Sequence, residues 1–223
     1  KMNNELIVAN NPKSGVAEAV KTIRTNLLFS SIDEPVKSIL MTSSLSGEGK
    51  SFICANLAIA FAQAGVKVLI VDCDLRRGRQ HKIFNVDNEL GLSNLLLDDV
   101  DKNYKKYIKK TKYENIYVLP MGIVPPNPSE LLASEKNRQL AKILKSKYDL
   151  VIYDCVPVGG LTDSIIMADL VDKIVIVSAY KVTPIEYLQN TKKALAQFEN
   201  KIAGVILNKF PSSKDRYYSK YYQ

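Results

Sequence analysis

The chain has 223 residues, of which 46% are hydrophobic and 24% are charged, and its formal net charge is +8. These are ordinary globular values, and the length suits one α/β domain, so the composition excludes global disorder. No apolar stretch approaches the roughly 18 residues that a membrane span needs, and no secretory start is present. We therefore expect a soluble, cytoplasmic protein.

The three cysteines, Cys54, Cys73 and Cys155, are widely spaced, and the only histidine is His81. This pattern argues against a disulfide framework or a zinc site and favours reduced, buried thiols. Cys73 and Cys155 each follow an aspartate at the end of a predicted strand. We expect them to fill space behind a phosphate site.

The chain begins with a polar segment, residues 1–15, which we expect to be an N-terminal extension. A helical pattern over residues 18–30 follows, with its apolar stripe at Val20, Ile23, Leu27 and Leu28. Six apolar runs are then separated by helical patterns, at 38–42, 67–72, 115–119, 150–154, 173–178 and 202–208. Runs that are apolar on both faces indicate a parallel sheet covered by helices on each side. Residues 16–210 are therefore predicted to form a doubly wound α/β domain with a mostly parallel sheet.

Before the fourth run, a proline-rich loop leads into a helix. Asn127 is placed as its N-cap, Pro128 at its first position and Glu130 to complete a capping box.

A glycine-rich loop, Ser-Leu-Ser-Gly-Glu-Gly-Lys-Ser at residues 44–51, lies between the first strand and the next helix. Its glycines let backbone N–H groups surround a β-phosphate, and the helix N-terminus adds partial positive charge. Lys50 can reach the β/γ oxygens, and the Ser51 hydroxyl can ligate Mg²⁺. We assign nucleotide binding to Ser46, Gly47, Glu48, Gly49, Lys50, Ser51 and Phe52. Ser44 replaces the usual first glycine.

Acidic residues end two of the predicted strands. Asp72 and Asp74 follow the second, and Asp154 ends the fourth in the Walker B pattern. One carboxylate can hold Mg²⁺ or its water, and another can accept a proton from an incoming hydroxyl. The metal is assigned to Ser51, Asp72 and Asp154, and catalysis to Lys50, Asp72, Asp74 and Asp154. The alternative is a charged strand end that begins a loop. Asp163 is also expected near the γ-phosphate.

Residues 211–223 are predicted to be a flexible, tyrosine-rich tail. Four of the twelve tyrosines fall in the last seven residues, at Tyr217, Tyr218, Tyr221 and Tyr222. Beside a nucleotide site, such a run of phenolic hydroxyls indicates where a phosphoryl group could be transferred. The alternative is aromatic packing on the domain or on a partner.

Much of the positive charge lies between residues 102 and 112, at Lys102, Lys105, Lys106, Lys109, Lys110 and Lys112. Such a stretch could contact anionic lipid or nucleic acid. The favoured alternative is a solvated helix face, and the stretch decides no function.

The order of these motifs resembles the bacterial tyrosine kinases of capsule and exopolysaccharide synthesis, over residues from about 14 to the end. The resemblance rests on the glycine loop, the Asp-x-Asp-x-Arg strand end, the segment Pro-Pro-Asn-Pro-Ser-Glu-Leu-Leu at 125–132, the Walker B strand and the tail. It implies a P-loop NTPase of the deviant Walker type that uses ATP and Mg²⁺ and phosphorylates its own tail. In that family the Asp-x-Asp strand is the second Walker A element.

The resemblance also implies assembly and partners. The family's Glu-x-x-Arg-x-x-Arg helix, which mediates ring assembly, is similar to Glu18, Lys21 and Arg24, with lysine in place of the first arginine. Phosphorylation in trans within a ring-like homo-oligomer is then expected, with regulation of polysaccharide synthesis and export. A transmembrane activator, or polysaccharide co-polymerase, would dock its cytosolic end on the kinase and hold it at the inner face of the membrane. No specific nucleic acid is expected.

Two other readings stay open. Dimer-switch ATPases of the partition or division-site type share this fold, but they carry a lysine early in the loop where this chain has Leu45. A nucleic-acid or membrane module with a silent nucleotide site would use the lysine-rich stretch instead. By position and by similarity to related folds, Asn208 and Lys209 are candidates for the adenine pocket, and Asn208 is included in the nucleotide site.

Overall fold

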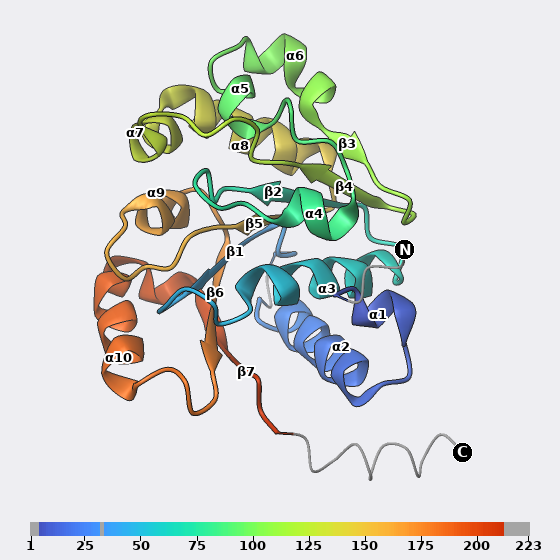
Figure 1. The fold of residues 1–223 in the computed structure, drawn as a ribbon, viewed down its shortest axis with the longest axis vertical. Coiled ribbons are helices and arrows are strands. Elements are labelled where there is room, and N and C mark those ends of the chain that lie inside the picture. The colour runs from blue at the N-terminus through green and yellow to red at the C-terminus, as the bar shows by residue number, and fades with distance from the viewer. Residues whose placement is uncertain (1–4, 32–33, 212–223) are drawn as a thin grey trace.

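The structure is a computed structural model that describes residues 5–31 and 34–211. Within these residues, seven strands form one sheet in the order β3-β4-β2-β5-β1-β6-β7, with helices on both faces (Figure 1). All neighbouring strands are parallel except β3 and β4. The predicted doubly wound, mostly parallel α/β sheet is confirmed.

The six predicted strands are all present, with bounds within a residue or two of those expected. The strands are β1 (Ser38–Ser43), β2 (Val68–Asp72), β3 (Lys109–Lys110), β4 (Ile116–Leu119), β5 (Leu150–Asp154), β6 (Lys173–Ala179) and β7 (Ile202–Asn208). The short antiparallel strand β3 was not predicted. It consists of two lysines, which carry no apolar pattern and pair with β4 at the edge of the sheet.

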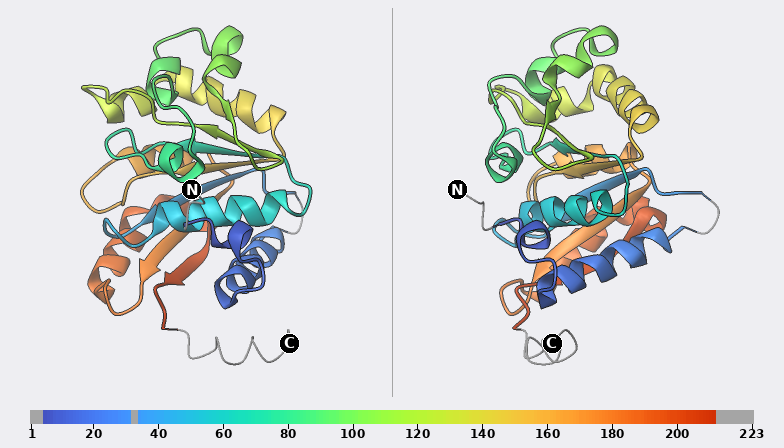
Figure 2. Two further views of the ribbon diagram at one scale, coloured as in Figure 1. Left: turned by 45° about the vertical axis from the view of Figure 1, so that its right-hand side comes forward. Right: turned by 90° about the vertical axis from the view of Figure 1, so that its right-hand side faces the viewer.

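The helices divide between the two faces of the sheet. One face is covered by α1 (Ile7–Asn10), α2 (Gly15–Leu28), α3 (Lys50–Ala62) and α4 (Gln80–Phe84). The other is covered by α5 (Leu92–Leu95), α6 (Val100–Tyr107), α7 (Pro128–Ala133), α8 (Glu135–Lys147), α9 (Asp163–Asp169), α10 (Ile185–Ala194) and the 3₁₀ helix η1 (Ala196–Lys201). Figure 2 shows α1 and α2 packed against α3.

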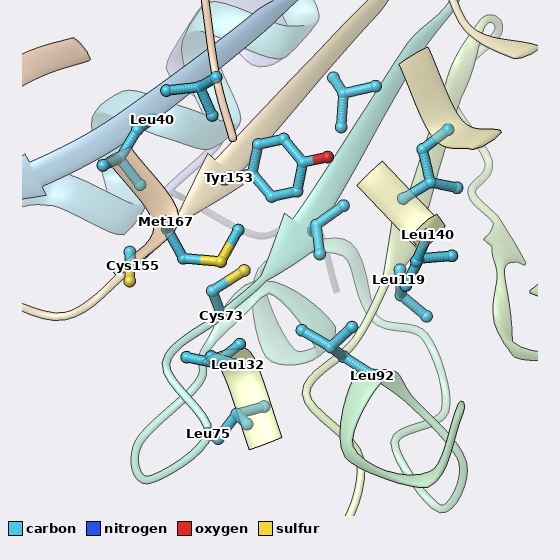
Figure 3. Close-up of a cluster of buried hydrophobic side chains, with 14 of the residues drawn as sticks. Leu40, Cys73, Leu75, Leu92, Leu119, Leu132, Leu140, Tyr153, Cys155 and Met167 are labelled. Atoms are coloured by element: carbon cyan, nitrogen blue, oxygen red, sulfur yellow. The ribbon is translucent and has the colours of Figure 1, made fainter. Parts of the chain in front are cut away.

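The central strands alternate their side chains strictly between the two cores. Ile70 and Ile152 point toward α3, whereas Val71 and Tyr153 point into the opposite core. The alternation continues past the strand ends, where Cys73 and Cys155 lie in the core of Leu, Tyr and Met side chains drawn in Figure 3. All three cysteines are free and buried, as expected.

The described part of the N-terminal extension packs against the domain. Leu6 and Val8 are 1% and 0% exposed. The amide of Asn56 on α3 fixes this segment, because its Oδ1 accepts the Val8 N–H at 2.9 Å and its Nδ2 donates to the Glu5 carbonyl at 2.7 Å. Leu6 and Val8 therefore contribute to the core of the domain.

Two local predictions were wrong. Leu28 was placed on the apolar stripe of α2 but is 58% exposed, because it lies one residue, or about 100°, around the helix from the buried Leu27. At α7, Asn127 is the N-cap and Pro128 takes the first position, as predicted, but the predicted capping box with Glu130 does not form. The Asn127 amide donates instead to Glu130 Oε2 at 2.7 Å, a charge-assisted bond that replaces the backbone cap.

Candidate nucleotide-binding site

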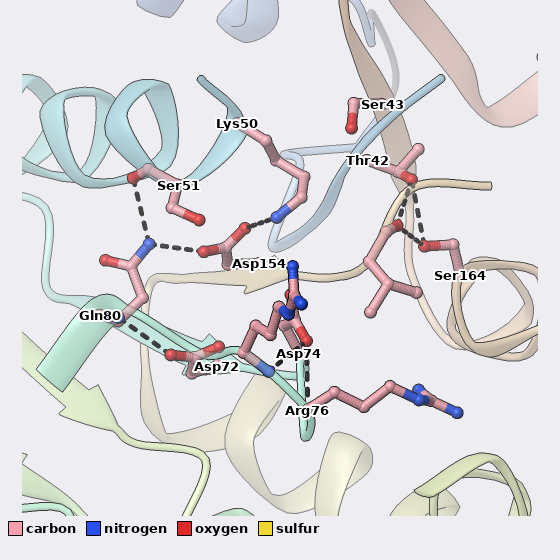
Figure 4. Close-up of polar contacts among 12 residues, drawn as sticks. Thr42, Ser43, Lys50, Ser51, Asp72, Asp74, Arg76, Gln80, Asp154 and Ser164 are labelled. Carbon is pink, nitrogen blue, oxygen red and sulfur yellow. Dashed lines mark hydrogen bonds and ion pairs between the residues drawn. The ribbon is translucent and has the colours of Figure 1, made fainter. Parts of the chain in front are cut away.

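The candidate site lies where the carboxyl ends of β1, β2 and β5 meet. The glycine loop joins β1 to α3, and Asp72 and Asp154 are direct neighbours on the paired strands β2 and β5. In an open α/β sheet this edge is where ligands bind. Figure 4 shows Lys50, Asp72, Asp154 and Gln80 converging there from four elements.

The backbone of the loop requires its two glycines. Gly47 and Gly49 have φ values of 82° and 90°, in the left-handed region that other residues rarely adopt. A Cβ atom at Gly49 would lie 2.1 Å from Asn208 Nδ2, so a side chain there would also displace the Asn208 amide from the loop. Gly49 is also the N-cap of α3 and supplies no side-chain cap to the first N–H groups of that helix. Those groups suit an anion, as expected for a phosphate loop.

Three side chains from the β6–β7 side of the sheet hold this loop. Thr191 Oγ1 donates to Ser44 Oγ at 2.9 Å, Asn208 Nδ2 donates to the Glu48 carbonyl at 2.8 Å, and Lys209 Nζ donates to the Gly47 carbonyl at 2.7 Å. Asn208 and Lys209 were expected in the adenine pocket. The structure places both against the loop itself, at the end of the last strand.

The carboxylate of Glu48 belongs to the architecture of the loop. The residue is 1% exposed, and its Oε2 accepts the Leu45 N–H at 2.7 Å. Its Oε1 accepts the Thr183 hydroxyl from the segment that leads into α10. Thr183 was not singled out from the sequence. It lies 135 residues from Glu48, and a lone threonine in a loop carries no local signal.

Lys50 forms a buried ion pair. Its Nζ lies 2.6 Å from Asp154 Oδ1, and the two side chains are 8% and 1% exposed. Burial lowers the pKa of Lys50, but the charge and hydrogen bond of Asp154 outweigh it and hold the pKa above its ordinary value. The lysine is therefore a fixed positive charge at the carboxyl ends of the strands.

Asp72 is fully buried beside this pair. Its Oδ2 accepts the Gln80 N–H at 2.9 Å, while its Oδ1 is buried without a hydrogen-bond partner among the described residues. Burial raises the pKa of Asp72 well above its usual range, and the charge of Asp154 raises it further. The Gln80 N–H and the charge of Lys50 only partly oppose these effects.

Gln80 joins the site although no sequence motif marks it. The residue is 0% exposed, and its Nε2 donates to Asp154 Oδ2 at 2.7 Å and to the Ser51 carbonyl at 3.1 Å. With its backbone N–H on Asp72, it connects both buried aspartates to the first turn of α3 (Figure 4). Its Oε1, like Asp72 Oδ1, is buried without a partner in the described part of the chain.

Asp74 and Asp163 shape the loops around the site. Asp74 Oδ1 accepts the backbone N–H groups of Arg76 and Arg77 at 3.2 and 2.8 Å, which closes the turn after β2. Its charge also contributes to the raised pKa of Lys50. Asp163, expected near a γ-phosphate, is 0% exposed, pairs with the Arg76 guanidinium and accepts the Ser129 hydroxyl at 2.6 Å. It thereby ties the turn to α7 and α9.

The oxygen donors of this site fit Mg²⁺. Residues 5–31 and 34–211 contain no group of three or more His, Cys, Asp or Glu side chains that could hold a metal. Mg²⁺ does not need one, because it binds through one or two carboxylates and completes its shell with water and phosphate. The partnerless Asp72 Oδ1 is a carboxylate oxygen that could fill such a role. Gly78 leaves room beside it, since a Cβ there would lie 2.6–2.8 Å from the carboxylate atoms of Asp72.

The assembly residues expected on α2 lie away from this site. Glu18 Oε1 and Lys21 Nζ pair at 2.7 Å, and Lys21 also donates to the Pro12 carbonyl at 3.0 Å. Arg24 instead donates to the Ala60 carbonyl, near the end of α3, at 2.7 Å. Within one chain, Arg24 therefore binds α3, whereas Glu18 and Lys21 stay on the partly exposed surface of α2.

The four proposed acceptor tyrosines lie outside the described residues. None of the helices in residues 5–31 and 34–211 has the length and apolar character of a membrane span.

Comparison with known proteins agrees with this fold. The AAA domain family matches residues 36–207. The chain is 39% identical to the putative tyrosine-protein kinase CapB of Staphylococcus aureus over 97% of this chain and 94% of that one. It is 38% identical to the tyrosine-protein kinase YwqD of Bacillus subtilis, over 99% and 92% of the two chains.

Solved structures give the same result. The crystal structure of the chimerical protein CapA2B2 superposes with a TM-score of 0.88 at 40% identity, over 93% of this chain and 91% of that one. The kinase domain of the Escherichia coli tyrosine kinase ETK gives 0.87 at 33% identity, over 96% and 84%. The septum site-determining protein MinD of Pyrococcus horikoshii, in complex with Mg-ADP, gives only 0.65 at 28% identity, over 80% and 72%.

The fold and the loop define a nucleotide-binding P-loop protein of the AAA domain class. Within that class the chain belongs to the bacterial tyrosine-protein kinase family, and it is a protein-tyrosine kinase.

Proposed function

We propose that this kinase transfers the γ-phosphoryl group of ATP to the tyrosines of its own C-terminal tail, Tyr217, Tyr218, Tyr221 and Tyr222, in a neighbouring copy. The observation that carries the proposal is the buried set of Lys50, Asp154 and Asp72 at the glycine loop, in a chain that ends in a tyrosine cluster. Within one site these residues supply a fixed cation, Lys50, a carboxylate paired with it, Asp154, and a second carboxylate with an unpaired oxygen, Asp72.

The proposed roles follow from these environments. Ser46, Gly47, Glu48, Gly49 and Phe52 would surround the phosphates through the loop backbone and the start of α3, with Asn208 holding the loop. Lys50 would offset negative charge on the transferring group. Ser51, Asp72 and Asp154 would hold Mg²⁺, which supplies further positive charge to the phosphate oxygens when bound.

The acceptor phenol must lose a proton during transfer, since an unperturbed tyrosine has a pKa near ~10. Asp72 would accept this proton only while its carboxylate does not hold Mg²⁺, and its Oδ1, which has no hydrogen-bond partner among the described residues, is the atom for that role. Asp74 is the second candidate. It lies two residues further on, and its carboxylate already accepts two backbone N–H groups.

Transfer in trans would need copies to assemble, which we assign to Glu18, Lys21 and Arg24 on α2. The partly exposed Glu18–Lys21 pair is the surface available for this. By likeness to its relatives, we further propose that the kinase regulates capsular or exopolysaccharide synthesis and export. The cytosolic end of a transmembrane activator would then recruit it to the inner face of the membrane. The similar protein CapA2B2 is a chimera, and its two-part name supports a partner for the kinase.

Mixing two variants tests transfer between copies. Lys50→Met keeps the tail but lacks the site lysine, and the variant with all four tail tyrosines changed to Phe keeps the site but lacks acceptors. We expect neither variant to be phosphorylated alone, and the Lys50→Met tail to gain steps of about 80 Da, the mass of a phosphoryl group, when the two are mixed with Mg-ATP. The exposed Lys142→Met is the matched control and should label itself like the wild type.

The result that would contradict the proposal is phosphate release without any mass gain in the mixture, even with the activator's cytosolic end supplied. That outcome would favour the dimer-switch ATPase. Leu45 argues against this alternative, because those enzymes place a lysine at its position.

A further inference from the structure

A recess lies at the end of the sheet opposite the glycine loop. It measures about 360 Å³ and is lined by Lys67, Tyr104, Lys105, Ile108, Lys110, Tyr117, Lys147 and Tyr148. These residues come from α6, β3, β4, the end of α8 and the segments that precede β2 and β5, which Figure 1 shows grouped in the upper part of the molecule. The recess therefore includes part of the lysine-rich stretch, for which the nucleotide site has no use.

Its walls combine positive charge with aromatic rings. Four lysines and no carboxylate line it. Lys67 Nζ lies 4.7 Å from the ring centroid of Tyr148 and 5.6 Å from that of Tyr117, and the two rings meet edge to face at 5.5 Å. The Lys67 ammonium also donates to the Lys147 carbonyl at 3.2 Å. The rings thus form a wall at which one cation is already held.

The other lysines are available to a ligand. Lys105, Lys110 and Lys147 are exposed, and none of them has an ion-pair partner within the described ranges. The adjacent carboxylate of Asp149 accepts the backbone N–H of Lys67 and does not line the recess. By contrast, Lys102 and Lys109, in the same stretch, pair with Asp99 and Asp87.

We propose that this recess binds phosphotyrosine, and that its ligand is the phosphorylated tail of another copy of the chain. A phosphotyrosine has the two parts that the recess matches: a dianionic group for the unpaired lysines and an aromatic ring for Tyr117 and Tyr148. A flat membrane surface would touch the lysines but leave the aromatic wall unused. The identity of the ligand rests on the proposed tail phosphorylation. The recess itself is a feature of the structure and does not depend on that proposal.

The charge of the tail makes this binding conditional on modification. Residues 212–223 contain Lys214, Arg216 and Lys220 against Asp215, so the unmodified side chains carry a net charge of +2 (three minus one) and are repelled by the recess. Each phosphoryl group adds about −1.5 to −2, so four of them reverse the sign. Because the recess and the glycine loop lie at opposite ends of the strands, both can be occupied at once.

Synthetic peptides test the recess independently of the kinase reaction. We would measure fluorescence anisotropy of labelled peptides of residues 212–223, with the full chain and saturating Mg-ADP so that the nucleotide site is filled. The peptide phosphorylated on all four tyrosines should bind, and the unmodified peptide should not. Lys105→Gln/Lys147→Gln should weaken binding at least tenfold. Lys142→Gln/Lys193→Gln, which removes the same charge from exposed lysines elsewhere on α8 and α10, should leave it unchanged.

Three results would overturn the proposal. The first is equal binding by the Lys105/Lys147 variant and the wild type. The second is equal binding of a peptide with phosphoserine at the four positions, which would show that the rings play no part. The third is that phosphatidylserine vesicles bind the protein through Lys105 and Lys147 whereas the phosphopeptide does not bind. That result would identify the recess as a lipid-binding surface. If the phosphopeptide binds but the kinase never modifies its own tail, the site stands and only the source of its ligand changes.

Discussion

Lys50 Nζ and Asp154 Oδ1 lie 2.6 Å apart in a buried place where each charge compensates the other. A buried pair of this kind contributes little net stability, but the loss of one partner leaves an uncompensated charge. The side chains that we assign to phosphate and metal are therefore also coupled in the stability of the fold.

The first prediction concerns this coupling. Lys50→Met should lower the free energy of unfolding by about 3 kcal/mol, because it leaves Asp154 buried without its cation. Lys50→Met/Asp154→Asn should recover most of this loss while remaining inactive. Urea denaturation of the three proteins measures it. A double variant as unstable as the single one would contradict the assigned coupling.

The second prediction concerns pH. Because the folded-state pKa of Asp72 is raised above its unfolded value, its contribution favours the fold below the unfolded pKa and is lost as pH rises through the folded one. Asp72→Asn removes this dependence and should be more stable than the wild type at pH 8, with the difference shrinking toward pH 4. Unfolding measured at a series of pH values in metal-free buffer checks the sign. Asp149→Asn, on an exposed residue, serves as control.

The third prediction assigns Gln80 as a positioning residue. Gln80→Met keeps the length of the side chain but loses the bonds to Asp154 and Ser51. We expect tail phosphorylation to slow at least about tenfold, since small displacements of site groups carry large kinetic costs. The KM for ATP should change little, because no phosphate contact is removed. An equal loss in kcat and rise in KM would instead indicate general damage to the site, and Gln189→Met on α10 gives the baseline.

The fourth prediction separates assembly from folding on α2. Arg24→Ala should lower stability by about 1–2 kcal/mol, because the Ala60 carbonyl near the end of α3 loses a charged donor. Lys21→Ala removes a partly exposed ion pair and an exposed hydrogen bond to the Pro12 carbonyl, and it should leave stability nearly unchanged while reducing oligomer size. Thermal melts together with light scattering test both variants. Full-size oligomers from Lys21→Ala would remove that residue from the assembly surface.

Much of the fold follows from local patterns. Buried parallel strands appear in sequence as short apolar runs, so β1, β2, β4, β5, β6 and β7 could be predicted, whereas β3 could not. The positions of Lys50, Asp72 and Asp154 were predictable for a related reason. Each stands at a strand end or in a glycine loop, and parallel strands bring those ends to one edge.

What could not be predicted depends on contacts between distant segments. Gln80 meets Asp154 across 74 residues, and Thr183 meets Glu48 across 135. Neither has a neighbouring pattern that marks it. The predicted capping box was wrong for the opposite reason: Asn127 is the N-cap, as predicted, but its amide bonds to the Glu130 carboxylate and neither side chain caps the backbone.

The alternation at the ends of β2 and β5 has a consequence for how this enzyme can vary. At the end of both strands, an aspartate of the candidate nucleotide-binding site is followed at once by a cysteine in the core. Inserting or deleting a single residue within either strand would exchange the directions of these two side chains. The carboxylate would then point into the hydrophobic core and the thiol toward the nucleotide site. We therefore expect the length of these strands to be constrained as tightly as the side chains assigned to catalysis. A change of one residue there should abolish kinase activity although every assigned amino acid is still present.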